Sequence, residues 1–142
     1  MSTATATIDG LLHELVARDA SDLHLKAGQP PVMRVRGSLI RADLPQFTPE
    51  QHEQVLMSIL TPDRKKRLHE FKEVDLSYNV PGLSRFRVNM FWQRGKIGAV
   101  FRVIPSQILT AEQLGLSPQL LQLCNLSKGL VLVTGPTGSG KT

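Results

Sequence analysis

The stretch SRFRVNMFWQRGKIGAVFRVI, residues 84–104, decides the fold because it reads as two strands joined by a tight turn. Polar and apolar side chains alternate through residues 84–93, which is typical of a strand with one face against a core. Arg94-Gly95-Lys96 supplies the turn, and residues 97–104 alternate again as the partner strand. The apolar faces of this hairpin carry Phe86, Val88, Met90 and Trp92, then Ile97, Ala99, Phe101 and Val103.

The residues before this hairpin predict helices and more strands of the same kind. Alternation predicts strands at residues 21–26, 32–36, 39–41 and 74–80. Helical spacing and start signals predict helices at residues 8–18, from 48 onward and from 61 to about 71. In the second helix Thr48 and Gln51 have the spacing of a capping box. The fold class is therefore α+β, with helices on an antiparallel sheet over residues 1–104.

The composition changes after the long hairpin. Residues 105–118 are predicted to be a linker with one short element around 109–114. A helix is expected from Ser117-Pro118 to about Cys124, with Cys124 as a packed residue. The continuous apolar run of residues 130–134 predicts a strand buried on both faces in a parallel sheet. Residues 119–142 therefore read as the start of an α/β domain.

That apolar run leads directly into a sequence with the pattern of a phosphate-binding loop, G-x-x-x-x-G-K-[ST]. The predicted nucleotide-binding residues are Gly135, Pro136, Thr137, Gly138, Ser139, Gly140, Lys141 and Thr142. Glycines let successive N–H groups turn toward phosphate oxygens, and Lys141 brings positive charge to the β- and γ-phosphates. Thr142 is predicted to offer its hydroxyl to Mg²⁺. ATP and Mg²⁺ are therefore the expected ligands.

No strand bearing an acidic residue for Mg²⁺ follows this loop within the 142 residues, and no group to orient an attacking water. The helix that normally begins after such a loop and helps to hold the anion does not follow either. We therefore expect no catalytic residue within this chain and no ATP hydrolysis by the 142-residue polypeptide alone. We expect either that the natural protein is longer than these 142 residues or that this reading frame is truncated.

Charge and composition limit the classes of partner without choosing among them. The chain has a net charge of +5 and a pI near 9.8, which permits nucleic acid, anionic lipid or a phosphate ligand. The basic run Arg64-Lys65-Lys66-Arg67 is most simply a solvated helix face. One cysteine excludes an internal disulfide. Neither a secretory signal nor a membrane-spanning stretch of roughly 18 apolar residues is visible, which predicts a soluble cytoplasmic protein.

Several stretches together resemble the PilT-like twitching-motility ATPases, which retract type IV pili, within the type II/type IV secretion ATPase superfamily. The stretches that carry the resemblance are 20–25 with 28–31, 34–37, 85–89, 99–105 and 129–142. The resemblance implies a PAS-like N-terminal domain followed by a RecA-like ATPase domain, which is truncated in this chain. It implies a homohexamer that uses ATP to drive pilus disassembly.

The same resemblance implies a location and a set of partners. The motor is expected at the cytoplasmic face of the bacterial inner membrane, with type IV pilus inner-membrane machinery as its partner. Membrane association is expected to be peripheral and through partners only, and no nucleic acid is expected. The start near residue 1, without a further N-terminal domain, resembles the retraction branch of the family more than the assembly or secretion branch.

In this family, arginines of the N-terminal domain face the nucleotide. The candidates that the resemblance assigns are Arg85, Arg87, Arg94 and Arg102. The residue pattern agrees in part, because Arg85 and Arg87 share one strand face and can reach one polyanion.

Three alternatives stay open at this point. One is a secretion or pilus-assembly ATPase of the same superfamily. Another is a nucleic-acid-binding module that uses the basic strand 84–94, with Phe91 and Trp92 stacking bases. That module lacks an RNA-recognition strand motif and leaves the phosphate-loop sequence unexplained. The third is a regulatory fragment that assembles with a full-length partner without doing chemistry.

Overall fold

A computed structural model of the chain describes residues 7–44, 47–105 and 109–135. Contacts divide the chain into two compact units, Met1–Ser106 and Gln107–Thr142, and each is described by itself. The predicted domain boundaries at residues 104 and 118 stay predictions.

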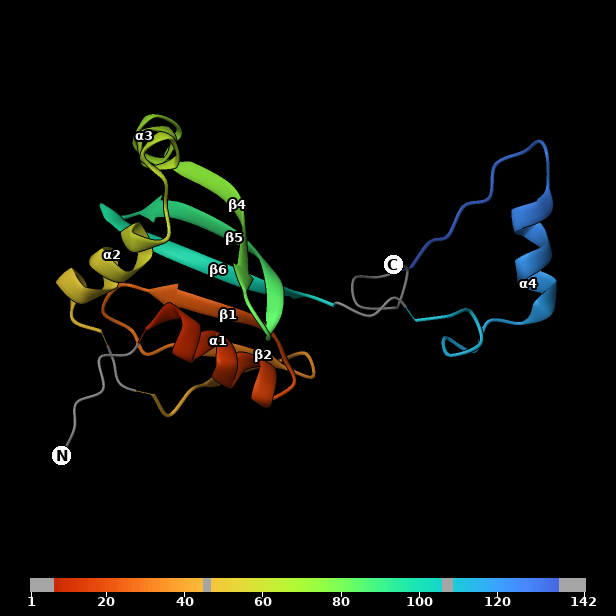
Figure 1. Ribbon diagram of the computed structural model, residues 1–142, viewed down its shortest axis with the longest axis horizontal. Helices are drawn as coiled ribbons and strands as arrows, with labels where there is room; N and C mark the ends of the chain where they lie inside the picture. The colour runs from red at the N-terminus through yellow and green to blue at the C-terminus, as the bar shows by residue number, and fades with distance from the viewer. Residues whose placement is uncertain (1–6, 45–46, 106–108, 136–142) are drawn as a thin grey trace. The chain divides into compact units, whose positions relative to one another are not determined.

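The first unit is a six-stranded antiparallel sheet in the order β3-β2-β1-β6-β5-β4 (Figure 1). The strands are β1 (Ala20–Lys26), β2 (Val32–Val35), β3 (Ser38–Arg41), β4 (Glu73–Val80), β5 (Ser84–Gln93) and β6 (Lys96–Ile104). Its helices are α1 (Ile8–Ala17), α2 (Pro49–Ser58) and α3 (Pro62–Phe71). The predicted α+β class is confirmed. The pairing of β1 with β6 is the long-range step, since it joins the first strand of the domain to the last.

Two tight turns fix the registers of the hairpins. In the β5–β6 turn Gln93 is paired with Lys96, and Arg94 and Gly95 both have positive φ, 52° and 74°. The β2–β3 turn repeats this with Arg36 and Gly37. Positive φ at both central residues matches the right-handed twist of the flanking strands, so each turn holds its hairpin in one register.

The capping box of α2 is present as predicted. The Thr48 backbone N–H donates to Gln51 Oε1 at 3.0 Å, and the Gln51 N–H donates to Thr48 Oγ1 at 3.2 Å. These two bonds satisfy N–H groups that have no partner inside the helix. The helix start is therefore fixed by side chains that the sequence already identifies.

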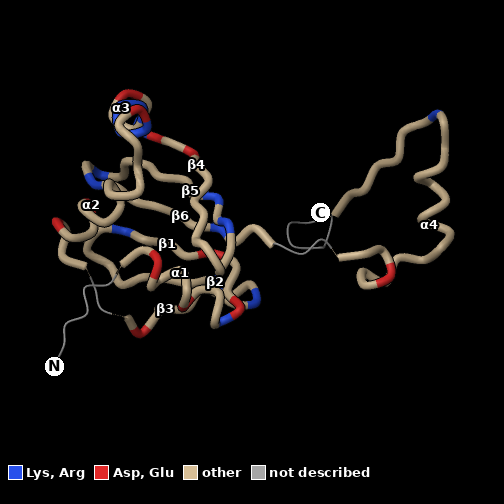
Figure 2. The backbone as a smooth tube through the Cα atoms, in the orientation of Figure 1, with Lys and Arg blue, Asp and Glu red and all other residues tan. Residues whose placement is uncertain are grey.

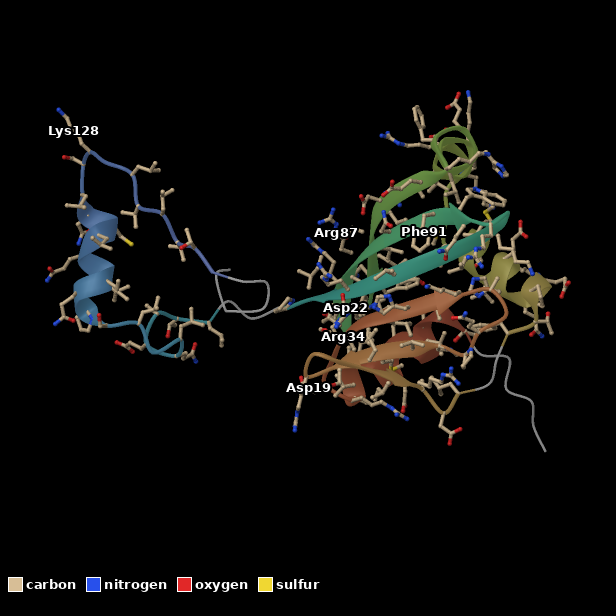
Figure 3. All side chains as sticks on the ribbon, turned by 180° about the vertical axis from the view of Figure 1, so that it is seen from behind. Asp19, Asp22, Arg34, Arg87, Phe91 and Lys128 are labelled. Atoms are coloured by element: carbon tan, nitrogen blue, oxygen red, sulfur yellow. The ribbon has the colours of Figure 1, made fainter. Side chains whose placement is uncertain are left out.

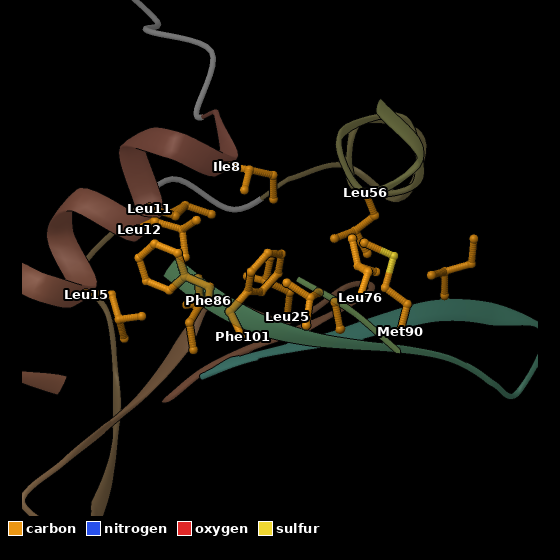
Figure 4. Close-up of a cluster of buried hydrophobic side chains, with 14 of the residues drawn as sticks. Ile8, Leu11, Leu12, Leu15, Leu25, Leu56, Leu76, Phe86, Met90 and Phe101 are labelled. Carbon is orange, nitrogen blue, oxygen red and sulfur yellow. The ribbon is translucent and has the colours of Figure 1, made fainter. Parts of the chain in front are cut away.

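The core lies between the helices and one face of the sheet (Figure 4). Leu12 and Leu15 of α1 and Leu56 of α2 pack there against Phe86 and Phe101. The predicted alternation of β5 is confirmed, because Phe86, Val88 and Met90 are buried while Arg85 and Arg87 are exposed. Within the described residues of this unit, no helix covers the opposite face of the sheet (Figure 3).

One polar group in this core was not predicted from the sequence. His52 of α2 is only 3% exposed, and its Nε2–H donates to the carbonyl oxygen of Ile97 at 2.9 Å. Burial lowers the pKa of the His52 imidazole, against the opposing effect of the bond to the Ile97 carbonyl. A neutral histidine therefore ties α2 to β6.

The lowered pKa of His52 predicts a loss of stability in mild acid. Below the usual histidine pKa of about 6.5, His52 binds a proton in the unfolded chain but stays neutral in the folded chain. The free energy of unfolding therefore decreases as the pH is lowered through this range. The variant His52→Gln keeps a hydrogen-bond donor for the Ile97 carbonyl but cannot bind this proton. We expect its free energy of unfolding to decrease less between about pH 7.5 and about pH 5.5 than that of the unaltered protein. Urea unfolding followed by the fluorescence of the single tryptophan, Trp92, measures this. His24 also has a lowered pKa and supplies a residual slope in both proteins.

The second unit corrects part of the prediction. Its elements are α4 (Pro118–Gln122) and a short 3-10 helix at Leu123–Asn125, and Cys124 is exposed rather than packed. The predicted strand at residues 130–134 is wrong for this chain: no strand forms there, and Leu130 and Leu132 are 83% and 74% exposed. A parallel strand exists only through hydrogen bonds to neighbours, and within the described part of the chain no segment pairs with this run.

Candidate functional site

A row of charged side chains crosses the uncovered face of the sheet. The register places Arg34 of β2 opposite Asp22 of β1, Asp22 opposite Arg102 of β6, and Arg102 opposite Arg87 of β5. We call these four residues the arginine row. In Figure 3, which views the sheet from behind, Arg34, Asp22 and Arg87 lie on this face. The row therefore places three cations and one carboxylate next to one another across four strands.

Asp22 is the fixed centre of the arginine row. It is 4% exposed, its Oδ1 accepts from Arg102 Nε at 2.8 Å, and its Oδ2 lies 3.6 Å from Arg34 Nε. Ser21 Oγ donates to Oδ2 at 2.7 Å. Burial alone raises the pKa of this carboxyl, but the bonds from Ser21 and Arg102 and the charge of Arg102 outweigh it, so the pKa is lowered. Asp22 is therefore a carboxylate at neutral pH.

Arg87 is held more loosely than Arg102. Its Nε lies 3.5 Å from Asp75 Oδ1, and both side chains are largely exposed, at 67% and 51%. Like charges directly opposite each other repel, and Arg87 and Arg102 are such a pair. Asp22 and Asp75 on either side offset this repulsion. The two guanidinium groups thus present donors toward solvent, where an anion can accept from them.

Arg85 stands one row further along β5. It pairs across the sheet with Ile104, the last residue of β6, and its side chain is exposed. Within residues 7–44, 47–105 and 109–135 no ion pair or side-chain hydrogen bond holds its guanidinium. The free cation of Arg85 and the arginine row therefore lie at the end of the sheet from which the chain leaves β6.

Arg94 is not part of this group. It occupies the β5–β6 turn, at the opposite end of β5 from Arg85. At the rise of an extended strand, the nine steps between them span about 30 Å. Of the four predicted arginines the structure brings together Arg85, Arg87 and Arg102, and it separates Arg94. Arg34 and Asp22 were missed, because the alternation in the sequence does not say which strands are neighbours.

The predicted phosphate-binding loop is largely outside the described residues. Gly135 is described, whereas Pro136, Thr137, Gly138, Ser139, Gly140, Lys141 and Thr142 are not. Among the residues that are described, no group of three or more His, Cys, Asp or Glu side chains is placed to hold a metal ion. No described helix is both long enough and apolar enough to cross a bilayer. The loop and its Mg²⁺ ligand Thr142 stay predictions.

The central role of Asp22 predicts a measurable cost when its charge is removed. In Asp22→Asn the hydrogen-bonding shape is kept, but Arg34 and Arg102 lose their shared counter-charge. We expect the free energy of unfolding to fall by about 2 kcal/mol, the scale of a hydrogen bond to a charged group. Urea unfolding of the two proteins measures the difference.

Asp75→Asn is the matched control for this substitution, since Asp75 pairs with Arg87 at the surface. Exposed ion pairs contribute less than about 1 kcal/mol, so the control is expected to unfold close to the unaltered protein. Equal losses in the two variants would mean that Asp22 is an ordinary surface charge.

The chain thus combines a helix-covered antiparallel sheet, arginines on the open face of that sheet, and a sequence with the pattern of a phosphate-binding loop. Comparison with known proteins identifies the family. The family described as "Type II/IV secretion system protein" matches residues 2–142, and the chain belongs to it. The predicted resemblance to the PilT-like branch of this superfamily is confirmed by individual relatives.

The chain is 47% identical over 135 residues to the "Type IV pilus retractation ATPase PilT" of Pseudomonas aeruginosa. That alignment covers 95% of this chain and 39% of the relative. It is 38% identical over 112 residues to the "Twitching motility protein" of Neisseria gonorrhoeae, covering 79% of this chain and 30% of the relative. The chain thus spans about two-fifths or less of the length of these relatives.

Solved structures show the same relationship. The crystal structure of the pilus retraction motor PilT with bound ADP matches with a TM-score of 0.81 and 41% identity, over 96% of this chain and 40% of that one. The ATPase DotB of Legionella pneumophila matches with a TM-score of 0.64 and 26% identity, over 99% and 41%. The fold is therefore that of the N-terminal region of these ATPases.

Proposed function

We propose that this chain is the N-terminal part of an ATP-hydrolysing hexameric motor that powers type IV pilus retraction at the cytoplasmic face of the inner membrane. The observation that carries the proposal is the 47% identity to a protein named as a retraction ATPase, over 95% of the chain. The match to the PilT structure with bound ADP supports the choice of an adenine nucleotide as ligand. The proposed partners are further copies of the full-length protein and the pilus machinery.

Two parts of the chain have distinct roles in this proposal. Backbone N–H groups of residues 135–142 other than Pro136 hold the phosphates, and Lys141 adds a positive charge to the terminal ones. Mg²⁺, held in part by the Thr142 hydroxyl, neutralises phosphate charge when it is bound. Arg85, Arg87 and Arg102 supply donors from the N-terminal domain, and Asp22 keeps Arg102 in place.

A chimeric motor tests the proposal. This chain replaces the matching N-terminal region of the P. aeruginosa PilT, and the chimera is produced in a strain that lacks its own PilT. We expect twitching motility to return with the chimera and to stay absent when the chimera carries Lys141→Ala. A second chimera, built with the matching region of the P. aeruginosa "Type IV pilus ATPase PilU", is the comparison, since that protein is 34% identical to this chain.

The outcomes separate retraction from other roles. A chimera that assembles and hydrolyses ATP without restoring twitching would assign the chain to a secretion or assembly ATPase of the same family. A chimera that assembles but neither binds nor hydrolyses ATP would overturn the motor function altogether. Binding of single-stranded nucleic acid that persists in Lys141→Ala would favour the module based on strand 84–94 instead.

A further inference from the structure

The basic helix α3 has an arrangement that the proposed motor function does not use. Its residues and the following Lys72 carry five cationic side chains against two carboxylates: Arg64, Lys65, Lys66, Arg67 and Lys72 against Asp63 and Glu70. Figure 2 shows this concentration of charge on α3, which lies beside the edge strand β4 (Figure 1). A basic run in the sequence is by itself explained by a solvated helix face, so a binding role for α3 needs further structural observations.

The first observation is that few side chains of α3 are buried. Leu68 is its one buried side chain, fully enclosed, whereas Lys65, Lys66 and Arg67 are all exposed. Because consecutive helical residues are 100° apart, these three cations point in different directions around the helix. The charge therefore covers a convex ridge instead of converging on a pocket.

The second observation is an exposed phenylalanine within this charge. Phe71, at the end of α3, is 69% exposed, and the Arg67 guanidinium carbon lies 5.6 Å from the centre of its ring. A phenylalanine left in water forgoes the free energy that burial of its ring would contribute. A single exposed apolar residue is ordinary, but this one lies among cations, so the ridge carries both the positive charge and an aromatic side chain that can contact a membrane surface.

We propose that α3 and Lys72 form a contact surface for an anionic phospholipid bilayer, with Phe71 entering between the headgroups. A plane of many phosphates matches cations that are distributed over a convex ridge, whereas a nucleic-acid strand needs a groove of one sign. The hollow next to α3 is lined by Arg64, Arg67 and Phe71 but also by the carboxylates of Glu73 and Asp75, which disfavours a nucleic-acid strand there. Each lysine or arginine near an anionic leaflet adds to the attraction between the helix and the membrane.

The single tryptophan of the chain provides a local reporter for this contact. Trp92 of β5 lies against the end of α3, with its ring centre 5.7 Å from that of His69 and 5.5 Å from Lys72 Nζ. A membrane bound at α3 changes the surroundings of Lys72 and His69. We therefore expect the emission of Trp92 to change on binding, in addition to co-sedimentation of the chain with vesicles.

The test compares the full chain on vesicles of phosphatidylcholine alone and of equal parts phosphatidylcholine and phosphatidylglycerol. Binding is expected only to the anionic vesicles and to weaken as salt is raised. Lys65→Glu with Lys66→Glu is expected to lower the affinity at least roughly 10-fold. Phe71→Ser is expected to lower it severalfold at unchanged net charge. Lys26→Glu with Lys128→Glu, two exposed lysines that do not belong to α3, makes the same change in net charge and is expected to bind nearly as well as the unaltered chain.

Three results would overturn the proposal. Equal binding to both kinds of vesicle would show contact through exposed apolar residues elsewhere. Equal loss in the two double variants would show a dependence on net charge and not on α3. A clear preference for a single-stranded oligonucleotide over anionic vesicles would assign the ridge to nucleic acid. Circular dichroism of each variant establishes that it is folded before it is compared.

Discussion

Replacing Lys141 with alanine in the full-length protein is expected to abolish useful ATP hydrolysis, with a loss of roughly 100-fold or more. The reason is the position that the sequence gives Lys141 in the predicted loop, next to the β- and γ-phosphates. Its charge is needed where negative charge must be stabilised during phosphoryl transfer. Steady-state phosphate release at saturating ATP and Mg²⁺ measures the effect.

Lys128→Ala is the matched control for this experiment. Lys128 is a lysine of the same unit, lies outside the predicted loop and is exposed (Figure 3). Its removal is expected to leave hydrolysis unchanged. If Lys141→Ala retained full activity while Lys128→Ala did so too, the predicted loop would not be the phosphate site.

The second large effect concerns the core of the first unit. Phe101 is fully buried in β6, opposite Leu23 of β1 on one side and Val88 of β5 on the other. Phe101→Ala is expected to lower the free energy of unfolding by about 3–5 kcal/mol, because it removes apolar contacts and leaves a cavity. That is a large part of the 5–15 kcal/mol that a domain typically has. Urea or thermal unfolding followed by Trp92 fluorescence measures it.

Phe71→Ala makes the same chemical change on a side chain that is 69% exposed, so it separates burial from residue type. Its cost is expected to stay within about 0.5 kcal/mol, as for surface substitutions in general. A loss comparable to that of Phe101→Ala would mean that Phe71 holds α3 in place. The role proposed for Phe71 at a membrane would then lose its basis.

The strands and helices of the first unit follow from local signals in the sequence. Alternation in residues 84–104 predicts both strands and their buried faces, because one face of the sheet packs under helices and the other meets water. Thr48 and Gln51 predict the start of α2 by a mechanism that needs only four consecutive residues. Such features depend on near neighbours and are therefore legible in a single sequence.

The centre of the candidate site depends on distant neighbours and was not predicted. Asp22 and Arg102 are separated by 80 positions, and nothing in either strand states that β1 lies between β2 and β6. Period-2 patterns assign a face but not an adjacent strand, so Asp22 and Arg34 were overlooked while Arg94 was grouped with arginines far from it. His52 was missed for the same reason, since its partner carbonyl belongs to β6.

The run at residues 130–134 shows the opposite failure. Its composition is that of a strand in a parallel sheet, yet composition supplies no hydrogen-bonding partner. Within the described residues the run forms no strand, and Leu130 and Leu132 are exposed. A local pattern thus states what a segment is suited for, and the rest of the sheet decides whether it forms.

The β1–β6 pair has a consequence for synthesis of the protein on the ribosome. One half of the sheet consists of β3, β2 and β1, and the other half consists of β6, β5 and β4. The hydrogen bonds between β1 and β6 join the two halves. Until Ile104 has left the exit tunnel, Leu23 and Leu25 lack the strand that flanks them, and the early half carries an open edge. We therefore expect nascent chains shorter than this to be degraded or bound by chaperones, and the domain to close in one late step.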